Sequence, residues 1–369
     1  MPTRVIMLVD LDYFFAQCEE KRNPSIKDKP VVVCVYSGRT EESGAVSTAN
    51  YIARSYGVKS GMPIYQAKKK LENVETIFLP VDYDYYEKVS GEVMRILRQF
   101  AGLFEQVGID EAFLDVTLRT NGRFQAAKEL AERIKNELKA QLGLTCSIGV
   151  GPNKLVAKVA ADQNKPDGLT VIEADNVEQF FSPLNVERLV GVGTITREKM
   201  QSMGIMTVGD LARYDTQKLM ETFGKTLGIY FHNAAQGMDN EPVKERTETE
   251  SLSRIATLKK DSRDIDFIME KAEQLCTELH AAIVDQKVSF KTIGIIVILN
   301  DMSNHSKSRT LENPTDSLQT MKENIRDLFK QFFDETMLEA RRVGVKISNL
   351  SHEKESQKQL TSFIQRNTD

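Results

Sequence analysis

The stretch Val5-Ile6-Met7-Leu8-Val9-Asp10-Leu11-Asp12-Tyr13-Phe14-Phe15 decides how the chain is organised. An apolar run that ends in Asp predicts a buried strand with a carboxylate at its tip. Further along, Val107-Gly108-Ile109-Asp110-Glu111-Ala112-Phe113-Leu114-Asp115 predicts a hairpin that turns at Gly108. Because neighbouring residues within a strand point to opposite faces, Asp110 and Glu111 can share one site only if they lie at this turn.

If the two strand ends converge, Asp10, Asp110 and Glu111 form one carboxylate cluster. Such a cluster needs cations, because like carboxylates cannot all ionise at close range. Oxygen-only ligands suit Mg²⁺, and two such ions about 4 Å apart serve in-line phosphoryl transfer. The alternative is a pair of separate solvated strand ends. Asp12 and Asp115 flank the cluster, but strand parity turns them away from it.

Length and composition bound the answer. The 369 residues predict about two to four small domains. No apolar run has membrane-spanning length and no leader is recognisable, so we expect a cytoplasmic protein without membrane contact. Four scattered cysteines and four isolated histidines indicate neither a zinc site nor a disulfide framework. The net charge of -4 argues against nucleic-acid binding unless the basic residues are segregated.

With these acids in place, the chain resembles the Y-family, or translesion, DNA polymerases, in particular archaeal members of the DinB (polymerase IV) branch. Four further segments carry the resemblance, residues 43–54, 153–168, 191–204 and 341–348. The combination is specific, although no single segment would be.

The resemblance implies an α+β multidomain fold with a palm, fingers, a helical thumb and a C-terminal α/β little finger. The predicted β-α-β-β-α-β order of the palm is that of a ferredoxin-like fold, with the fingers as an insertion. The expected boundaries are palm 1–13 and 81–172, fingers 14–80, thumb 173–238, linker 239–250, little finger 251–350 and a clamp-binding tail 351–369.

The resemblance also assigns residues to the incoming nucleotide. Tyr51 and Arg54 would contact its triphosphate, with Thr48 nearby, and Lys165 would grip the phosphates. Arg forms bidentate bonds to phosphate oxygens, and Tyr adds a hydroxyl donor. The carbonyl of Leu11 would add a metal ligand. Without the family context, Arg54 would be a solvated helix residue and Lys165 a turn lysine.

Phe15 lies where the family has a bulky aromatic against C2′ of the sugar. It would act as a steric gate, because a phenyl ring can reject a 2′ hydroxyl only by occupying space. The alternative is an ordinary core residue that packs on Tyr13 or Phe14.

Two regions are expected to bind DNA. Gly191 and Gly193 belong to a predicted helix-hairpin-helix, whose backbone amides can approach a phosphate, although an ordinary αα-turn has the same pattern. The strands predicted within 251–350 are basic while the helices between them are acidic, so one sheet face would bind DNA unless both surfaces are simply solvated. The basic residues assigned to this face are Arg254, Lys259, Lys291, Lys307, Arg309 and Arg342.

The C-terminal tail carries a pattern typical of sliding-clamp ligands. Gln357, Leu360, Phe363 and Ile364 fit the motif of PCNA-like clamps, with Ile where an aromatic is usual. A chance apolar helix that packs on its own domain is the alternative.

The predicted function is that of a low-fidelity, template-directed DNA polymerase. Asp10, Asp110 and Glu111 would hold two Mg²⁺ ions, and the enzyme would extend primer-template DNA with dNTPs as a monomer. A nucleotidyl cyclase and a non-catalytic DNA or clamp adaptor are the alternatives. The thumb and little-finger segments argue against a cyclase, and the intact acid triad argues against an adaptor.

Overall fold

A computed structural model describes residues 3–245 and 249–352 of the chain. The chain forms two compact units, one of Met1–Val35 and Val46–Arg246 and one of Tyr36–Ala45 and Thr247–Asp369. The four cysteines are buried and free. Among the described helices, none combines the length and the apolar character needed to cross a membrane.

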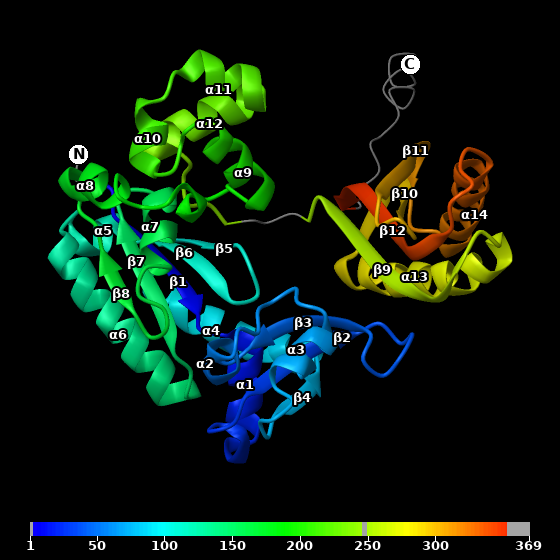
Figure 1. Ribbon diagram of the computed structural model, residues 1–369, viewed down its shortest axis with the longest axis horizontal. Coiled ribbons are helices and arrows are strands. Elements are labelled where there is room, and N and C mark those ends of the chain that lie inside the picture. Colours follow the sequence, from blue (N-terminus) through cyan, green and yellow to red (C-terminus); the bar gives the residue numbers. More distant parts are fainter. Residues whose placement is uncertain (1–2, 246–248, 353–369) are drawn as a thin grey trace, which may run out of the picture. The chain divides into compact units, whose positions relative to one another are not determined.

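The larger unit is built on a five-stranded sheet with strand order β5-β6-β1-β7-β8 (Figure 1). The central strand β1 lies between β6 and β7 and is antiparallel to both. With helices α4 and α6 these strands form the predicted ferredoxin-like palm. The elements are β1 (Ile6–Leu11), α4 (Tyr83–Arg98), β5 (Leu103–Gln106), β6 (Glu111–Asp115), α5 (Thr117–Thr120), α6 (Phe124–Leu142), β7 (Cys146–Gly151), α7 (Lys154–Ala161) and β8 (Leu169–Val171).

Strand β1 is apolar except for Asp10 because helices cover both faces of the sheet. Met7 and Val9 belong to the core that α4 and α6 complete, whereas Ile6 and Leu8 pack with residues of α7. Helix α7 lies directly against β7 at Gly149, where a Cβ atom would lie 2.0 Å from the carbonyl oxygen of Ala157. This close approach fixes the position of α7, and hence of its lysines, relative to the tip of β1.

The predicted fingers follow β1 as an insertion. Their sheet has the order β3-β2-β4, with β2 and β4 parallel. The elements are α1 (Phe14–Arg22), β2 (Val31–Tyr36), β3 (Gly44–Ala49), α2 (Tyr51–Ser55), α3 (Ile64–Lys70) and β4 (Ile77–Pro80).

Residues 173–238 are helical in the structure, as the lack of strand signals predicts. A capping box between Thr207 and Asp210 starts one helix. The segment shares its apolar core with α7 of the palm, which contributes Val156 and Ala160. The helices are α8 (Val177–Phe181), α9 (Thr194–Ser202), α10 (Val208–Arg213), α11 (Thr216–Phe223) and α12 (Lys225–Ala235).

The first part of the predicted linker is docked on the palm rather than free. Val243 is 2% exposed and shares a small core with Leu8 and Phe113. The Lys154 ammonium pairs with Glu105 at 2.9 Å and with Glu241 at 3.1 Å. Polar and apolar contacts therefore hold the first part of the predicted linker, up to residue 245, against the palm, and the linker assignment over 239–250 itself stays a prediction.

The smaller unit contains a four-stranded antiparallel sheet in the order β11-β10-β12-β9, and both helices contribute to the same core. Strand β12 still pairs at Ser351 and His352, so the predicted tail boundary at 351 moves to 353. The elements are β9 (Ser251–Ser262), α13 (Ile265–Gln286), β10 (Val288–Leu299), β11 (Asn304–Thr315), α14 (Leu318–Asp334) and β12 (Ala340–His352).

Candidate active site

The three predicted acids meet at one end of the palm sheet. Asp10 and Glu111 are direct cross-strand partners in the β1–β6 ladder, so their side chains leave the sheet on the same face. The turn before β6 brings in Asp110, whose carbonyl oxygen accepts a 2.9 Å hydrogen bond from the Leu11 amide. All three acids line one pocket, as the sequence predicts.

Two lysines form ion pairs with two of these three acids. The Lys158 ammonium pairs with Glu111 and lies 3.6 Å from Asp10, and Lys165 pairs with Asp10 at 2.8 Å. Burial, together with the nearby charges of Asp10 and Glu111, raises the pKa of Asp110. As the side chains stand, no three Asp, Glu, His or Cys residues in the described ranges are grouped to coordinate a metal. The oxygen-only donor set nevertheless fits a divalent cation such as Mg²⁺.

Sequence reasoning missed Lys158. It lies on α7, whose residues other than Lys154 and Lys158 are all Leu, Val or Ala. Two lysines spaced i and i+4 in an otherwise apolar helix indicate that both ammonium groups have specific partners. That signal was available in the sequence, but their partners, Glu105 and Glu111, were not.

The acids form the floor of a pocket of about 380 Å³. The predicted nucleotide ligands Thr48, Arg54 and Lys165 line it, and so does Phe15. The Arg54 guanidinium lies 4.9 Å from the centre of the Tyr51 ring, and its Nε donates to the carbonyl of Ala49. The remaining lining residues are Leu11, Tyr13, Phe14, Ser47, Ser60 and Lys158.

Buried polar side chains hold the arginine-bearing helix α2 in place. Asn50 caps α2 by accepting a hydrogen bond from the Ala53 amide at 3.0 Å, and it donates to Glu20 at 2.8 Å. Glu20 also accepts a bond from the Tyr13 hydroxyl. The Tyr13 ring contacts Tyr51 edge-on at 5.5 Å. The orientation of Tyr51 is thus coupled to α1 through Glu20.

Phe15 combines both interpretations that its sequence position allows. Its ring lines the pocket, yet it also packs on the palm core. It is stacked on Tyr86 with a centroid distance of 4.3 Å. A core contact and a pocket contact are therefore two sides of one half-buried ring.

Asp12 and Asp115 lie outside the acid cluster, but strand parity is not the reason, because residues two or four positions apart in a strand point to the same face. Asp12 lies beyond the end of β1 at Leu11, and Asp115 lies four residues from Glu111 along β6. Asp12 is 1% exposed and accepts hydrogen bonds from Thr145, Ser147 and the Asp167 amide, all between 2.8 and 2.9 Å. Asp115 accepts a bond from the Thr117 amide. The contacts of Asp12 hold the loop that carries Lys165.

The two glycines of the predicted helix-hairpin-helix precede α9. Gly191 has a φ of 85°, which a residue with a side chain rarely adopts. Gly193 is the N-cap residue of α9, and no described atom lies within 4 Å of the position that a Cβ atom would take. The backbone at Gly193 is therefore open to close approach.

The predicted basic sheet face is divided by strand register. Lys307 and Arg309 pair across the ladder with Ile295 and Ile293, which are buried in the helix-side core. The Lys307 ammonium accordingly forms an ion pair at 2.7 Å with Glu335, the C-cap residue of α14. Arg309 lies 3.6 Å from Asp327 of α14 and donates a hydrogen bond to Asn324. The prediction that these two share the exposed sheet face is wrong.

Arg254 also lies on the helix side. Its Nε is 4.0 Å from Glu278 of α13, and it has the parity of buried Leu258. Lys259 follows the buried Leu258, so it points to the opposite face, and Arg342 shares that face. Lys291 lies where the pairing of β10 with β11 is irregular, so alternation does not assign it to a face. Lys346, four residues after Arg342, lies on the same face as Lys259 and Arg342.

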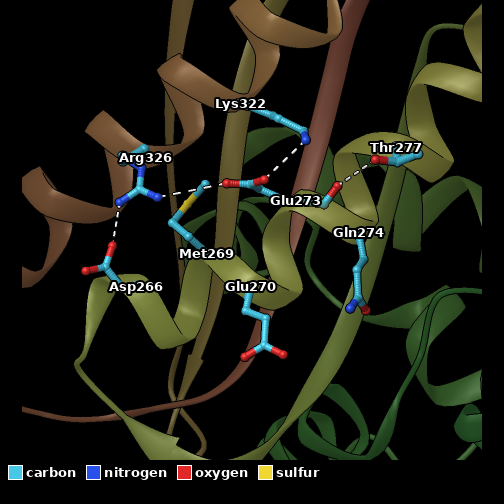
Figure 2. A pocket seen from close by; sticks show the side chains of 8 residues that line it. All are labelled: Asp266, Met269, Glu270, Glu273, Gln274, Thr277, Lys322 and Arg326. Carbon is cyan, nitrogen blue, oxygen red and sulfur yellow. Dashed lines mark hydrogen bonds and ion pairs between the residues drawn. The ribbon is translucent and has the colours of Figure 1, made fainter.

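A separate groove of about 450 Å³ lies between α13 and α14, far along the chain from the acids (Figure 2). Each of the two basic residues that line this groove is paired with an acid. Arg326 pairs with Asp266 at 2.7 Å, and Lys322 pairs with Glu273 at 3.1 Å. Among the described residues, the groove therefore holds paired charges of both signs, whereas the palm pocket gathers three acids.

The predicted clamp motif, Gln357, Leu360, Phe363 and Ile364, lies outside the described residues.

Comparison with known proteins gives matches along most of the chain. The model described as "impB/mucB/samB family" matches residues 9–162, its C-terminal domain model matches 249–362, and "DNA polymerase-iota, thumb domain" matches 187–239. DNA polymerase IV of Nitrosopumilus maritimus is 45% identical over 99% of this chain and 100% of its own length. DNA polymerase IV of Saccharolobus solfataricus is 36% identical over 93% of this chain and 96% of its own.

Solved structures are similar over the same extent. A "Y-family DNA polymerase chimera Dbh-Dpo4(243-245)-Dbh" is 35% identical, covers 94% of this chain and 99% of its own, and has a TM-score of 0.89. An "Insertion ternary complex of Dbh DNA polymerase" is also 35% identical with the same coverage, and its TM-score is 0.69.

Proposed function

Because the chain belongs to the Y-family DNA polymerases of the DinB branch and is a DNA-directed DNA polymerase, we propose that the acid-lined palm pocket is its catalytic centre. Asp10, Asp110 and Glu111 are the catalytic acids of this proposal. The observation that carries it is their meeting in one pocket with the phosphate-binding candidates Arg54 and Lys165. A cyclase and a non-catalytic adaptor are excluded by the family.

Members of this family depend on a divalent metal, and we assign two Mg²⁺ ions to the acids and to the Leu11 carbonyl. When bound, such ions activate the primer 3′ hydroxyl and neutralise the leaving pyrophosphate. The chain's own part is to present oxygen ligands on rigid strands. Lys158 and Lys165 compensate the acids in the present structure, and Lys165 lies where it can turn from Asp10 to the phosphates of a nucleotide.

Arg54 and Thr48 line the pocket and Tyr51 contacts Arg54, which supports the assignment of these three residues to the triphosphate. A guanidinium offers paired donors that match phosphate oxygens, and the stack on Tyr51 limits its freedom before substrate arrives. Phe15 then lies on the wall where we place the sugar. In this proposal its ring excludes a 2′ hydroxyl sterically, which makes Phe15 the steric gate.

Primer-template DNA and dNTPs are the substrates. One related structure is titled a ternary complex, which supports both partners. For the sequence-independent backbone contacts, we propose the open backbone at Gly191 and Gly193 together with Lys259, Lys291 and Arg342. A PCNA-like clamp that binds the tail, a monomeric state and a cytoplasmic location complete the proposal.

Primer extension tests the catalytic assignment. Asp110→Ala and Glu111→Ala should each abolish extension with dNTPs and Mg²⁺, because each removes a metal ligand without removing a DNA contact. Fluorescence anisotropy should show primer-template affinity close to that of the unmodified enzyme. Asp115→Ala, which alters an acid on the same hairpin but away from the pocket, is the matched control. Near-normal turnover in either pocket mutant would refute the assignment.

A further inference from the structure

One face of the Phe15 ring is covered by a second aromatic ring. Tyr86 of α4 stacks on it with an interplanar angle of 14°, and Tyr83 contacts it edge-on at 6.0 Å. Tyr86 is fully buried, whereas Phe15 remains half-exposed and lines the nucleotide pocket. The gate candidate is therefore a ring backed by core on one side and open to the pocket on another.

Tyr86 itself is fixed at its far end. Its hydroxyl donates a 2.7 Å hydrogen bond to Glu19, which is 5% exposed. Glu19 also accepts from Arg22, whose guanidinium reaches Asp82 at 2.8 Å. Asp82 in turn caps α4 by accepting from the Tyr85 amide. These contacts form a closed circuit between α1, which carries Phe15, and α4, which carries Tyr86.

The circuit keeps the hydroxyl of Tyr86 in its donating form. Burial and the bond to Glu19 raise the pKa of Tyr86 above its usual range. A ring held by a stack at one end and a charge-assisted hydrogen bond at the other has few rotamers open to it. The backing that it gives to Phe15 is accordingly stiff.

A steric gate discriminates only if it cannot move aside. A half-exposed phenylalanine pressed by a 2′ hydroxyl could turn about χ1 or χ2 if soft space lay behind it. We propose that Tyr86 is a positioning residue for sugar selection, whose anchored ring prevents Phe15 from retreating when a ribonucleotide enters. This inference rests on the proposed role of Phe15 as the gate.

A purely structural role for Tyr86 predicts a different result. Truncation of a buried aromatic lowers stability and the fraction of active enzyme, and both nucleotide types lose activity together. The ratio of kcat/KM for a dNTP to kcat/KM for the matching rNTP is insensitive to that fraction, since both constants come from one preparation. The ratio is therefore the readout that separates positioning from general destabilisation.

Single-nucleotide insertion kinetics with dNTP and rNTP test the proposal. Tyr86→Leu should lower the dNTP-to-rNTP ratio about three- to tenfold, the scale of one aromatic pair. Tyr86→Phe keeps the stack but removes the anchor to Glu19, so its ratio should lie between those of the unmodified enzyme and Tyr86→Leu. Phe124→Leu, which truncates another buried aromatic of the same core, is the control and should leave the ratio unchanged. If Tyr86→Leu does not fold, Tyr86→Met fills the space with a flexible chain and no flat face.

Phe15→Ala separates failure of the gate from failure of its backing. It should lower the dNTP-to-rNTP ratio by orders of magnitude, and adding Tyr86→Leu to it should change the ratio no further. An unchanged ratio in folded Phe15→Ala protein would overturn the gate itself. A normal ratio in both Tyr86→Leu and Tyr86→Met, beside a collapsed ratio in Phe15→Ala, would overturn only the role of Tyr86.

Discussion

Lys154 holds the segment after the thumb helices against the palm, and its removal should lower the free energy of unfolding substantially. Its side chain is 8% exposed, and its main partner, the Glu105 carboxylate, is 1% exposed. Its other ionic partner, Glu241, is 58% exposed, and the ammonium also lies 5.2 Å from the centre of the Phe113 ring. Lys154→Met preserves the apolar stem and removes only the charge, so the buried Glu105 carboxylate loses the ammonium that pairs with it at 2.9 Å.

The magnitude follows from burial. Breaking a buried ion pair from one side costs about 3–5 kcal/mol, because one charge is left without compensation. For a unit of roughly 150–250 residues this corresponds to a fall in Tm of about 10 °C. Glu105→Gln should cost less, because the Lys154 ammonium keeps Glu241 as a partner. The double mutant Lys154→Met/Glu105→Leu should recover most of the loss, since neither charge then remains buried.

Differential scanning calorimetry of the unmodified enzyme, the two single mutants and the double mutant gives the changes in Tm directly. Lys128→Met, which alters an exposed lysine, is the matched control. Limited proteolysis supplies a second readout, because release of the docked segment should expose the peptide bond after Lys244 to trypsin. A Tm of Lys154→Met within about 2 °C of the control would refute the reasoning, given the sensitivity expected for this size. So would a double mutant as unstable as the single one.

Three further outcomes are expected. Asp12→Ala should lower the Tm and raise the KM for dNTP, measured by calorimetry and steady-state kinetics, because its three hydrogen bonds hold the Lys165 loop; an unaltered KM would contradict this. Deletion of residues 353–369 should spare basal extension and remove stimulation by a sliding clamp, which supplies local concentration rather than chemistry, whereas undiminished stimulation would make the motif a coincidence. Arg342→Ala should weaken DNA binding and reduce the salt slope by about one, whereas Lys307→Ala should not; equal slopes in an anisotropy titration would contradict the division of the sheet.

The sequence was sufficient for the palm because its signals there are local. An apolar strand that carries Asp10 near its end and a turn at Gly108 are each visible within a short window. Their convergence needs only the strand order, which the β-α-β-β-α-β pattern restricts to few arrangements. Strand parity was the wrong argument for separating Asp12 and Asp115 from the three acids, because residues two or four positions apart share a face. They are separated instead by the end of β1 at Leu11 and by distance along β6. The docked segment at residues 239–245 was missed because acidic, Pro-containing sequence resembles a linker, and its burial depends on partners in the palm.

The basic strands failed for a different physical reason. Enrichment of lysine and arginine along a strand gives no face until the register is known, and a shift of one residue exchanges the two faces. Irregular pairing interrupts β10 between Phe290 and Thr292, so simple alternation cannot be carried through that strand. Lys307 and Arg309 can reach their acidic partners from the helix side because long side chains extend past the apolar layer at a sheet edge. Composition alone therefore places the basic residues on the correct sheet, but it does not show which of them lie on the helix side and which on the opposite face.

For the acid cluster, the sequence predicts the carboxylates but not the cations that pair with them. A carboxylate at a strand tip is a local feature, but the charge that balances it comes from wherever the fold brings a cation near. Here the two cations come from α7 and from the loop after it, and neither Lys158 nor Lys165 is near the acids in sequence. Since Asp10 and Glu111 face each other across a ladder, the palm needs these lysines whenever no other cation is present. Any cation that enters must compete with an ammonium group already in place, so the affinity of the pocket for metal depends on the lysines as well as on its acids.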